Sequence, residues 1–393
     1  MQLLFVHSHI FMKCNQNYYT TGQLPYELFE TRYLNNFEQV TVCSRTTNVK
    51  NQGNLNQSNG KNVVIKSLPN VSIIKGRLKA LKTTKEILKK EIKKVDVVVA
   101  RMPSRHAYYA MKIAKEIKKP LVVEVVGDVF ESLWNHGSVF GKILGPISAK
   151  KYKKEIKTSK YTIYVTKKHL QKEYPSARNA YTINASNVEL EPSSKFILKR
   201  RQEREENRPT NKLKIGLIGS YSSKYKGIHS GVDLISYLNK LNIDAELHIL
   251  GSGDNQWLLK RARKKNVIND IYFDGLLPIG DPVLEWLDML DLYIQPSLTE
   301  GLPRALIEAM SRGLPAVGSN VGGIPELIEP KFLHKPNNSD DLINKVFSLI
   351  QDREEMMIQS EKNFIKAQDY STKVLRKKRN NFWETVIEKE LKS

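Results

Sequence analysis

Cysteine is almost missing from this chain, which has only Cys14 and Cys43 among its 393 residues. So few cysteines argue against a disulfide scaffold and suit a reducing compartment. Glycine and proline are also sparse, and 40% of the residues are apolar, which excludes a disordered or collagen-like chain. No Cys/His cluster has the spacing of zinc ligands, so we expect no metal site.

Long hydrophobic runs are missing as well. No stretch approaches the length that spans a bilayer. The first residues, Met1–His7, form an apolar run that is too short for a signal peptide and has no basic lead. They are typical of a first β-strand. We therefore expect a cytoplasmic protein.

Acidic residues are outnumbered, with 41 Asp and Glu against 63 Lys and Arg, which gives a net charge of +22. This surplus favours an anionic partner, such as nucleic acid, an acidic membrane or anionic substrates. Many basic residues lie in 74–95, where apolar residues recur at helical spacing. The segment predicts a basic amphipathic helix, whose apolar side packs on its own sheet, contacts anionic lipid, or does both. We predict peripheral contact with the inner face of the plasma membrane through helix 74–95.

The order of short apolar strands and helices is typical of parallel sheets covered on both faces. It occurs twice, which predicts an α/β protein with two doubly wound, Rossmann-like domains. We place the first domain at 1–190, the second domain at 213–370 and a long helix at 371–393. The charged segment between the domains, 191–212, is interpreted as a linker or as a long exposed helix. Such domains leave a cleft, toward which the carboxyl ends of the strands point.

The most informative segment is Thr299–Met310, which follows the apolar run Leu290–Pro296. The pattern predicts a strand, a short loop and a helix that begins at Pro303. The free N–H groups of such a helix start form a seat for phosphate. Glu300 and Glu308 flank this seat, and ionised carboxylates are suited to accept hydrogen bonds from hydroxyl groups. A ligand with phosphate between hydroxyl groups is a nucleotide sugar. The plainer explanation of Glu308 is an i,i+4 ion pair with Arg304.

Two lysines follow the predicted strand 213–218. Lys226 lies where a loop opens the next helix and is placed to pair with phosphate charge on a leaving group. Lys224 is a second candidate in this loop, and a solvated surface lysine is the alternative for both. The loop lacks the G-x-x-x-x-G-K-[ST] pattern, and 251–253 lacks the spacing of a dinucleotide fingerprint.

The first domain offers candidates at its strand ends. Gly22 lets backbone approach a phosphate or an acceptor, or simply precedes a helix that we expect at 23–36. Arg101 and Ser104 follow a strand and point to the acceptor side of the cleft, and His9 is either an acceptor contact or a buried polar residue. Asp128 binds sugar hydroxyls, acts as a catalytic base, or caps a helix.

Together these motifs resemble the retaining glycosyltransferases of family four, which have the GT-B fold. The match comprises the E-x7-E spacing of Glu300 and Glu308 and the downstream segments 313–315 and 322–326. The resemblance implies that Glu308 binds the ribose, that Glu300 contacts the transferred sugar, and that no metal or other cofactor is needed. It also implies that the last helix crosses back to the first domain. The implied donor site contains Gly22, Gly219, Lys224, Lys226, Glu300, Gly301, Leu302, Pro303, Arg304 and Glu308, with Lys226, Glu300 and Asp128 as catalytic candidates.

The expected reaction is sugar transfer from a nucleotide-diphosphate sugar, with retention, to a lipid-linked or oligosaccharide acceptor of a cell-surface polysaccharide such as capsule or O-antigen. Ser220 departs from the family pattern, because an arginine usually stands there, and Val126 stands where a histidine is often found. Two alternatives stay open. One is a GT-B sugar-nucleotide epimerase, and the other is a nucleic-acid-binding protein, although no nucleic-acid motif is recognisable and no such partner is expected.

Overall fold

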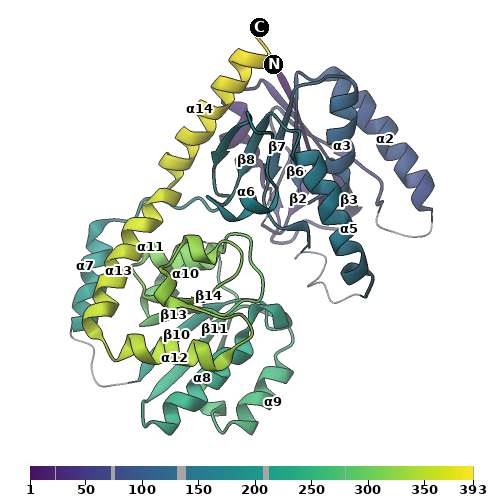
Figure 1. Cartoon of the computed structure of the whole chain (residues 1–393). Helices are drawn as coiled ribbons and strands as arrows, with labels where there is room; N and C mark the ends of the chain where they lie inside the picture. Colours follow the sequence, from purple (N-terminus) through teal and green to yellow (C-terminus); the bar gives the residue numbers. More distant parts are fainter. Residues whose placement is uncertain (23, 72–75, 131–138, 207–211, 279, 393) are drawn as a thin grey trace. The chain divides into compact units, whose positions relative to one another are not determined.

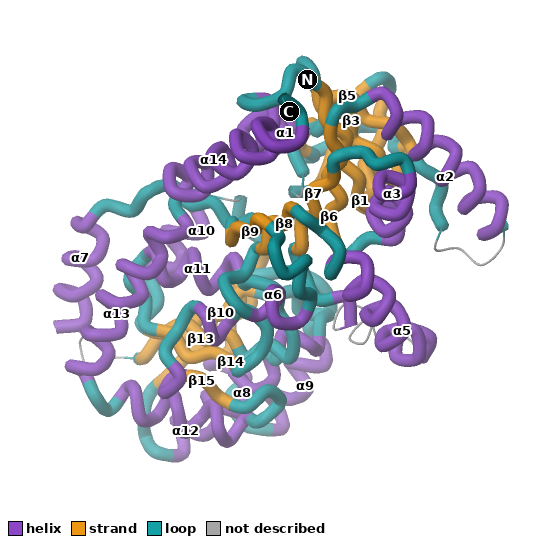
Figure 2. The backbone as a smooth tube through the Cα atoms, turned by 45° about the horizontal axis from the view of Figure 1, so that its top comes forward, coloured by secondary structure: helices purple, strands orange, loops and turns teal. Residues whose placement is uncertain are grey.

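The computed structural model describes residues 1–22, 24–71, 76–130, 139–206, 212–278 and 280–392. The chain folds into two compact units, Met1–Asn187 with Leu375–Ser393, and Val188–Val374. Each unit has its own sheet with helices packed on it, as Figures 1 and 2 show. The predicted α/β fold with two Rossmann-like domains is confirmed.

The sheet of the first unit has the order β4-β2-β1-β6-β7-β8-β9, and β3 and β5 extend it beside β1. Its strands are β1 (Gln2–Cys14), β2 (Asn17–Thr20), β3 (Gln39–Asn48), β4 (Asn56–Gln57), β5 (Val63–Ser67), β6 (Val97–Met102), β7 (Leu121–Val125), β8 (Tyr161–Tyr164) and β9 (Tyr181–Asn184). The helices of this unit are α1 (Tyr26–Phe29), the π-helix η1 (Glu30–Leu34), α2 (Arg77–Lys94), α3 (Arg105–Glu116), α5 (Val139–Ile156), α6 (His169–Glu173) and α14 (Thr372–Glu390).

The start of the chain differs from the sequence prediction. β1 does not end near His7 but continues to Cys14 and turns back into β2, with a shift of register between Val6 and Ile10. Asn15 has a φ of +53°, and this left-handed residue allows the tight turn. The helix expected at 23–36 is replaced by the short α1 and η1. Because β1 is this long, the chain reaches Gly22 only after a second strand.

Helix α14 completes the core of the first unit. Phe382 and Trp383 are fully buried, and the Trp383 ring lies 6.0 Å from that of Tyr33 and 5.0 Å from that of Phe37. Arg379 donates to the carbonyl of Ser186 at 2.6 Å. The chain therefore returns from the second unit to the first, as the resemblance implies.

Helix α2 packs on α3, and the two lie side by side in Figure 1. Leu88 and Ile92 are fully buried, so the second half of the predicted apolar stripe belongs to the core. Leu78, in the first turn of α2, is 85% exposed and lies between Arg77 and Lys79. Packing on the sheet thus accounts for only part of the stripe.

The second sheet has the order β12-β11-β10-β13-β14-β15, and all its described strand pairs are parallel. Its strands are β10 (Leu213–Ile218), β11 (Ala245–Leu250), β12 (Ile271–Gly275), β13 (Leu292–Gln295), β14 (Ala316–Ser319) and β15 (Leu333–His334). Its α-helices are α7 (Lys195–Glu206), α8 (Ile228–Lys240), α9 (Gln256–Lys264), α10 (Asp281–Asp288), α11 (Arg304–Ser311), α12 (Ser339–Ile350) and α13 (Arg353–Ala367). Short 3-10 helices are η2 (Lys224–Lys226), η3 (Ile268–Asp270), η4 (Ile324–Glu326), η5 (Pro330–Phe332) and η6 (Gln368–Tyr370).

The segment 191–212, interpreted from the sequence as a linker or a long exposed helix, is helical over Lys195–Glu206. Helix α7 occupies most of it, belongs to the second unit and packs beside α13 (Figures 1 and 2). Arg201, in the charged run, is buried. The low apolar content of this segment therefore reflects a helix held by guanidinium hydrogen bonds.

Among the described residues, no helix combines the length and the apolar character needed to cross a membrane.

We expect Trp383→Ala to destabilise the first unit by about 3–5 kcal/mol, because it removes a large, fully buried ring and leaves a cavity. Urea unfolding followed by circular dichroism measures the change. Glu384→Ala, an exposed neighbour on α14, is the control and should shift the midpoint little. Equal midpoints for the two variants would contradict the docking of α14.

Candidate functional site

Two loops of the second unit meet where β10 and β13 end. Gly227 has a φ of +70°, and a Cβ atom there would lie 2.0 Å from the carbonyl oxygen of Pro296. Only glycine fits this close approach. The N–H of Leu298 also donates to the carbonyl of Tyr225 at 2.7 Å. The loop that contains Lys226 is thereby fixed against the loop that contains Glu300.

This packing brings two predicted site residues together. Lys226 Nζ lies 2.6 Å from Glu300 Oε1, and both side chains are mostly buried. The same oxygen accepts hydrogen bonds from Ser297 Oγ at 2.8 Å and from Gln295 Nε2 at 3.1 Å. One carboxylate oxygen of Glu300 is therefore held by three donors, which fixes the direction of the other.

The amide of Gln295 is itself oriented. Tyr293 donates its hydroxyl hydrogen to Gln295 Oε1 at 3.1 Å and accepts from the N–H of Ile218 at 3.2 Å. Because the amide oxygen is occupied by this donor, the NH₂ group faces Ser297 and Glu300. A buried hydrogen-bonded chain thus runs from the end of β10 to the Glu300 carboxylate. Burial raises the pKa of Tyr293, so its hydroxyl remains a donor.

The glycine pair 322–323 supports the loop from the other side. A Cβ atom on Gly322 would lie 1.7 Å from the carbonyl oxygen of Glu300. Gly323 donates its N–H to the carbonyl of Gly301 at 2.7 Å. The segment after this pair forms the 3-10 turn η4. The pair therefore acts as a backbone support for the Glu300 loop.

Helix α11 begins as predicted, with Pro303 as its N-cap residue. Leu306 and Met310 are fully buried and hold the helix on the sheet. The first N–H groups of a helix have no partner within it, and the start of α11 directly follows the loop of Glu300 and Gly301, which is the arrangement that favours an anion.

Glu308 lies one turn into α11 and is buried. Arg304 Nη1 lies 3.2 Å from its Oε1, so the ion pair considered from the sequence does form. Burial nevertheless raises the pKa of Glu308, and Arg304 opposes this shift only in part. A carboxylate in this position gains from any hydroxyl donor that reaches it, because such a bond favours the ionised form.

Of the other residues predicted for the donor site, Gly219 lies against Lys226, whereas Lys224 does not. A Cβ atom on Gly219 would lie 3.2 Å from Lys226 Cγ, so the absence of a side chain makes room for the lysine. Lys224 points elsewhere, with its Nζ 5.9 Å from the centre of the Trp257 ring. Ser220 lies in the turn after β10 and is exposed. Within the part of the chain that the structure describes, no group of His, Cys, Asp and Glu is arranged to hold a metal ion.

In the first unit, Arg101 turns inward. Its Nη1 lies 2.9 Å from Glu124 Oε2, and Tyr33 donates to the other oxygen of Glu124 at 2.6 Å. Arg101 is 8% exposed. We expected an acceptor contact at this residue, but its charge is committed to a buried ion pair that joins β6 and β7.

Ser104 caps α3 and accepts from the N–H of Ala107, and its hydroxyl also bonds Ser8 at 2.7 Å. His9 Nε2 lies 2.9 Å from Thr20 Oγ1. Burial, and then the charge of Arg45, lowers the pKa of His9 to about 4, so His9 is neutral at physiological pH. Both predicted acceptor residues thus already have protein partners, and His9 remains half exposed.

Asp128 and Gly22 occupy the ends of other strands. Asp128 follows β7, and its Oδ1 accepts from Tyr174 at 2.9 Å, while the same hydroxyl accepts from the N–H of Val129. The Asp128 carboxylate is therefore held by a tyrosine that also contacts the backbone just after it. Gly22 is exposed, follows β2 and has a φ of +151°.

The sequence prediction missed the side chains that orient Glu300, namely Tyr293, Gln295, Ser297 and Ser319. Ser319 donates to the carbonyl of Ser297 and is fully buried, as is Ser297. A signal was present, since a glutamine and a tyrosine in the apolar run before the loop are unusual in a buried strand. A polar side chain in such a strand has to be hydrogen-bonded.

The second unit, and the chain as a whole, are similar to known proteins. The family model described as glycosyl transferases group 1 matches residues 199–367. Protein CapJ of Staphylococcus aureus is 37% identical over 367 residues, which cover 92% of this chain and 90% of CapJ. The amylovoran biosynthesis glycosyltransferase AmsK of Erwinia amylovora is 34% identical over 157 residues, which cover 38% of this chain and 37% of AmsK.

Among solved structures, Anabaena Alr3699/HepE in complex with UDP-glucose is similar in fold, with a TM-score of 0.65 at 16% identity. The similarity covers 98% of this chain and 100% of that one. The long match to CapJ, and the family match over the unit that contains Lys226 and Glu300, show that the chain belongs to the group 1 glycosyl transferases and has the GT-B fold.

Proposed function

We propose that the chain is a retaining hexosyltransferase-type glycosyltransferase. It moves a sugar from a nucleotide-diphosphate sugar to a lipid-linked or other saccharide acceptor in the biosynthesis of a cell-surface polysaccharide. The observation that carries the proposal is the meeting of Lys226 and Glu300 beside the start of α11. Similarity to HepE, whose structure contains UDP-glucose, and to AmsK, a glycosyltransferase of amylovoran biosynthesis, supports the substrate class.

The donor is proposed to bind along this loop. The diphosphate takes the N–H groups around Leu302 and Arg304, and Lys226 supplies the positive charge. Glu308 accepts from the ribose hydroxyls. Glu300 has one oxygen tied to the protein, so its other oxygen accepts from hydroxyls of the transferred sugar. In this arrangement helix dipole and lysine replace a metal ion, and no cofactor is required.

Transfer then proceeds on one face of the sugar. The bond between the anomeric carbon and the diphosphate oxygen breaks, and the acceptor hydroxyl oxygen bonds that carbon from the same side. The acceptor proton passes to the departing diphosphate. Negative charge on the leaving group is greatest in the transition state, so Lys226 contributes most there. The first unit is proposed to bind the acceptor near His9 and Gly22.

Attachment to the inner face of the plasma membrane would bring a lipid-linked acceptor to the enzyme. Its proposed basis is the start of α2, where an exposed leucine lies between basic residues. An apolar side chain within a cationic surface is the combination that binds anionic bilayers.

Lys226→Ala and Glu308→Ala should separate the two proposed roles. Loss of the lysine should lower kcat by about 10²–10³, because it removes transition-state charge stabilisation. Loss of Glu308 should lower kcat/KM for the nucleotide sugar by about tenfold or more, through lost hydrogen bonds to an ionised acceptor. Steady-state kinetics of sugar transfer measures both. Lys240→Ala, on the exposed end of α8, is the control, and normal kinetics in both site variants would refute the proposed donor site.

The orientation of Glu300 is tested with Gln295→Glu. The new carboxylate cannot donate to Glu300, so kcat should fall by about tenfold near neutral pH. Because neighbouring carboxylates raise each other's pKa, the new acid protonates as the pH is lowered and can then donate as the amide did. The pH profile of kcat should therefore show partial recovery toward acid.

Gln359→Glu is the matched control for this experiment. Gln359 is as buried as Gln295 but exchanges hydrogen bonds with the backbone of Ala316. It should lower stability without any recovery of kcat at acid pH. The same pH profile in both variants would show that Gln295 has only a structural role.

Leu78→Asp should weaken binding to anionic vesicles by about tenfold, because it replaces an exposed apolar side chain with a negative charge. Flotation with phosphatidylglycerol vesicles measures the bound fraction. Leu241→Asp makes the same change at an exposed leucine of the second unit and should bind normally. Recovery of wild-type protein only in the soluble fraction would count against membrane contact.

A further inference from the structure

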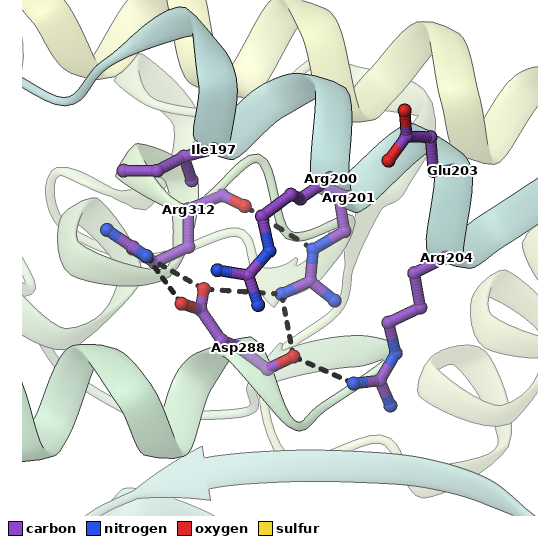
Figure 3. A pocket seen from close by; sticks show the side chains of 7 residues that line it. All are labelled: Ile197, Arg200, Arg201, Glu203, Arg204, Asp288 and Arg312. Atoms are coloured by element: carbon purple, nitrogen blue, oxygen red, sulfur yellow. Dashed lines mark hydrogen bonds and ion pairs between the residues drawn. The ribbon is translucent and has the colours of Figure 1, made fainter.

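The second unit has a cavity of about 330 Å³ between α7 and the C-terminal ends of α10 and α11. Figure 3 shows three guanidinium groups around one carboxylate, with a fourth guanidinium nearby and Glu203 turned away. The lining residues are Ile197, Arg200, Arg201, Glu203, Arg204, Asp288 and Arg312, and we call this cavity the arginine pocket.

Two of the four arginines have a structural task. Arg201 donates to the carbonyls of Leu290 and Leu287, and Arg204 donates to the carbonyls of Met289 and Asp288. These carbonyls lie at and just after the end of α10, where a helix has unpaired C=O groups and partial negative charge. Helix capping therefore explains why both guanidiniums are here, but carbonyl groups do not neutralise their charge.

Carboxylates balance only part of the positive charge. Asp288 pairs with Arg312, whose Nε lies 2.8 Å from Asp288 Oδ1. Asp291 pairs with Arg204, whose Nη2 lies 3.0 Å from Asp291 Oδ1. Glu203 also lines the pocket and lies 3.7 Å from Lys199. Four arginines against these three carboxylates leave a surplus of one positive charge.

Arg200 is the arginine without a structural explanation. Within the described part of the chain it forms no ion pair, and its guanidinium lies 6.0 Å from the centre of the Phe196 ring. It nevertheless points into the pocket beside Arg201 and Arg312 (Figure 3). Burial, and then repulsion from Arg204, lowers the pKa of Arg201 to about 10. An exposed side chain that only needed solvent would turn away from this repulsion.

We propose that the arginine pocket binds a phosphate group, as the free ion or on a small phosphorylated compound. A phosphate anion suits a pocket with surplus positive charge, and planar guanidinium forks match its oxygen geometry. The volume lies in the range of small-molecule sites. The pocket is distinct from the proposed donor loop, because Arg312 follows the C-terminal end of α11 and the donor loop precedes its N-terminal end. Eight helical residues separate these ends by about 12 Å.

Thermal unfolding of the full chain tests the proposal, because a ligand of the native state raises Tm. Inorganic phosphate, titrated at constant ionic strength, should raise the Tm of the wild type. Arg200→Gln should lower the phosphate affinity derived from this shift by about tenfold or more. Without phosphate this variant should be at least as stable as the wild type, because repulsion is relieved.

Lys195→Gln is the matched control, since it removes one exposed positive charge from the same helix outside the pocket. It should keep the wild-type response to phosphate. Equal responses of Arg200→Gln, Lys195→Gln and the wild type would overturn the proposal, whatever the donor loop binds. A response to glucuronate without one to phosphate would overturn it as well.

Diffraction from crystals soaked in tungstate, a phosphate-like anion, gives the location. Anomalous density beside Arg200 in the wild type, and none there in Arg200→Gln, is the expected result, and density only at other places refutes the pocket. Flotation with phosphatidic acid vesicles separates the sources. A loss of binding in Arg200→Gln but not in Lys195→Gln identifies a lipid headgroup, whereas unchanged flotation with a retained response to phosphate identifies a soluble phosphorylated compound.

Discussion

The candidate site depends on backbone atoms that approach each other more closely than any side chain allows. At Gly227 and at Gly322, a Cβ atom would collide with the carbonyl oxygens of Pro296 and Glu300. These two contacts hold the Glu300 loop from both sides, so its position does not depend on the flexible ends of side chains. A lysine and a glutamate can therefore meet at 2.6 Å without relying on an exposed ion pair, which by itself contributes little.

The two carboxylates of the loop are prepared in different ways. Glu300 has one oxygen saturated by donors, so its orientation is fixed before any ligand arrives. Within the described part of the chain, the Glu308 carboxylate is held by Arg304, and burial still raises its pKa, so a further donor would favour the ionised form. One acid is thus preorganised and the other gains most when a ligand hydroxyl reaches it. Such a division of tasks suits a ligand with hydroxyl groups on both sides of a phosphate.

Much of this arrangement could be predicted from the sequence, because local patterns determine it. Apolar strands, the proline at the start of α11 and the acid spacing are visible within a dozen residues. The network that orients Glu300 was not predicted as a whole, since Ile218 and Lys226 reach it only when β13 lies beside β10. Likewise, no spacing rule shows that Arg101 turns toward Glu124 on the next strand. Long-range pairing decides both cases.

The same excess of basic residues has opposite effects at two helices. On α2 the lysines spread from a helix whose buried side is apolar, so each keeps its own water and the charges act together only over a surface. On α7 the guanidiniums converge, and burial of Arg201 removes the water that would screen its charge. Repulsion between like charges is therefore stronger at α7 than at α2. A diffuse counter-charge is therefore enough for α2, whereas α7 requires a compact anion at one place. This difference follows from where the charges point, not from how many there are.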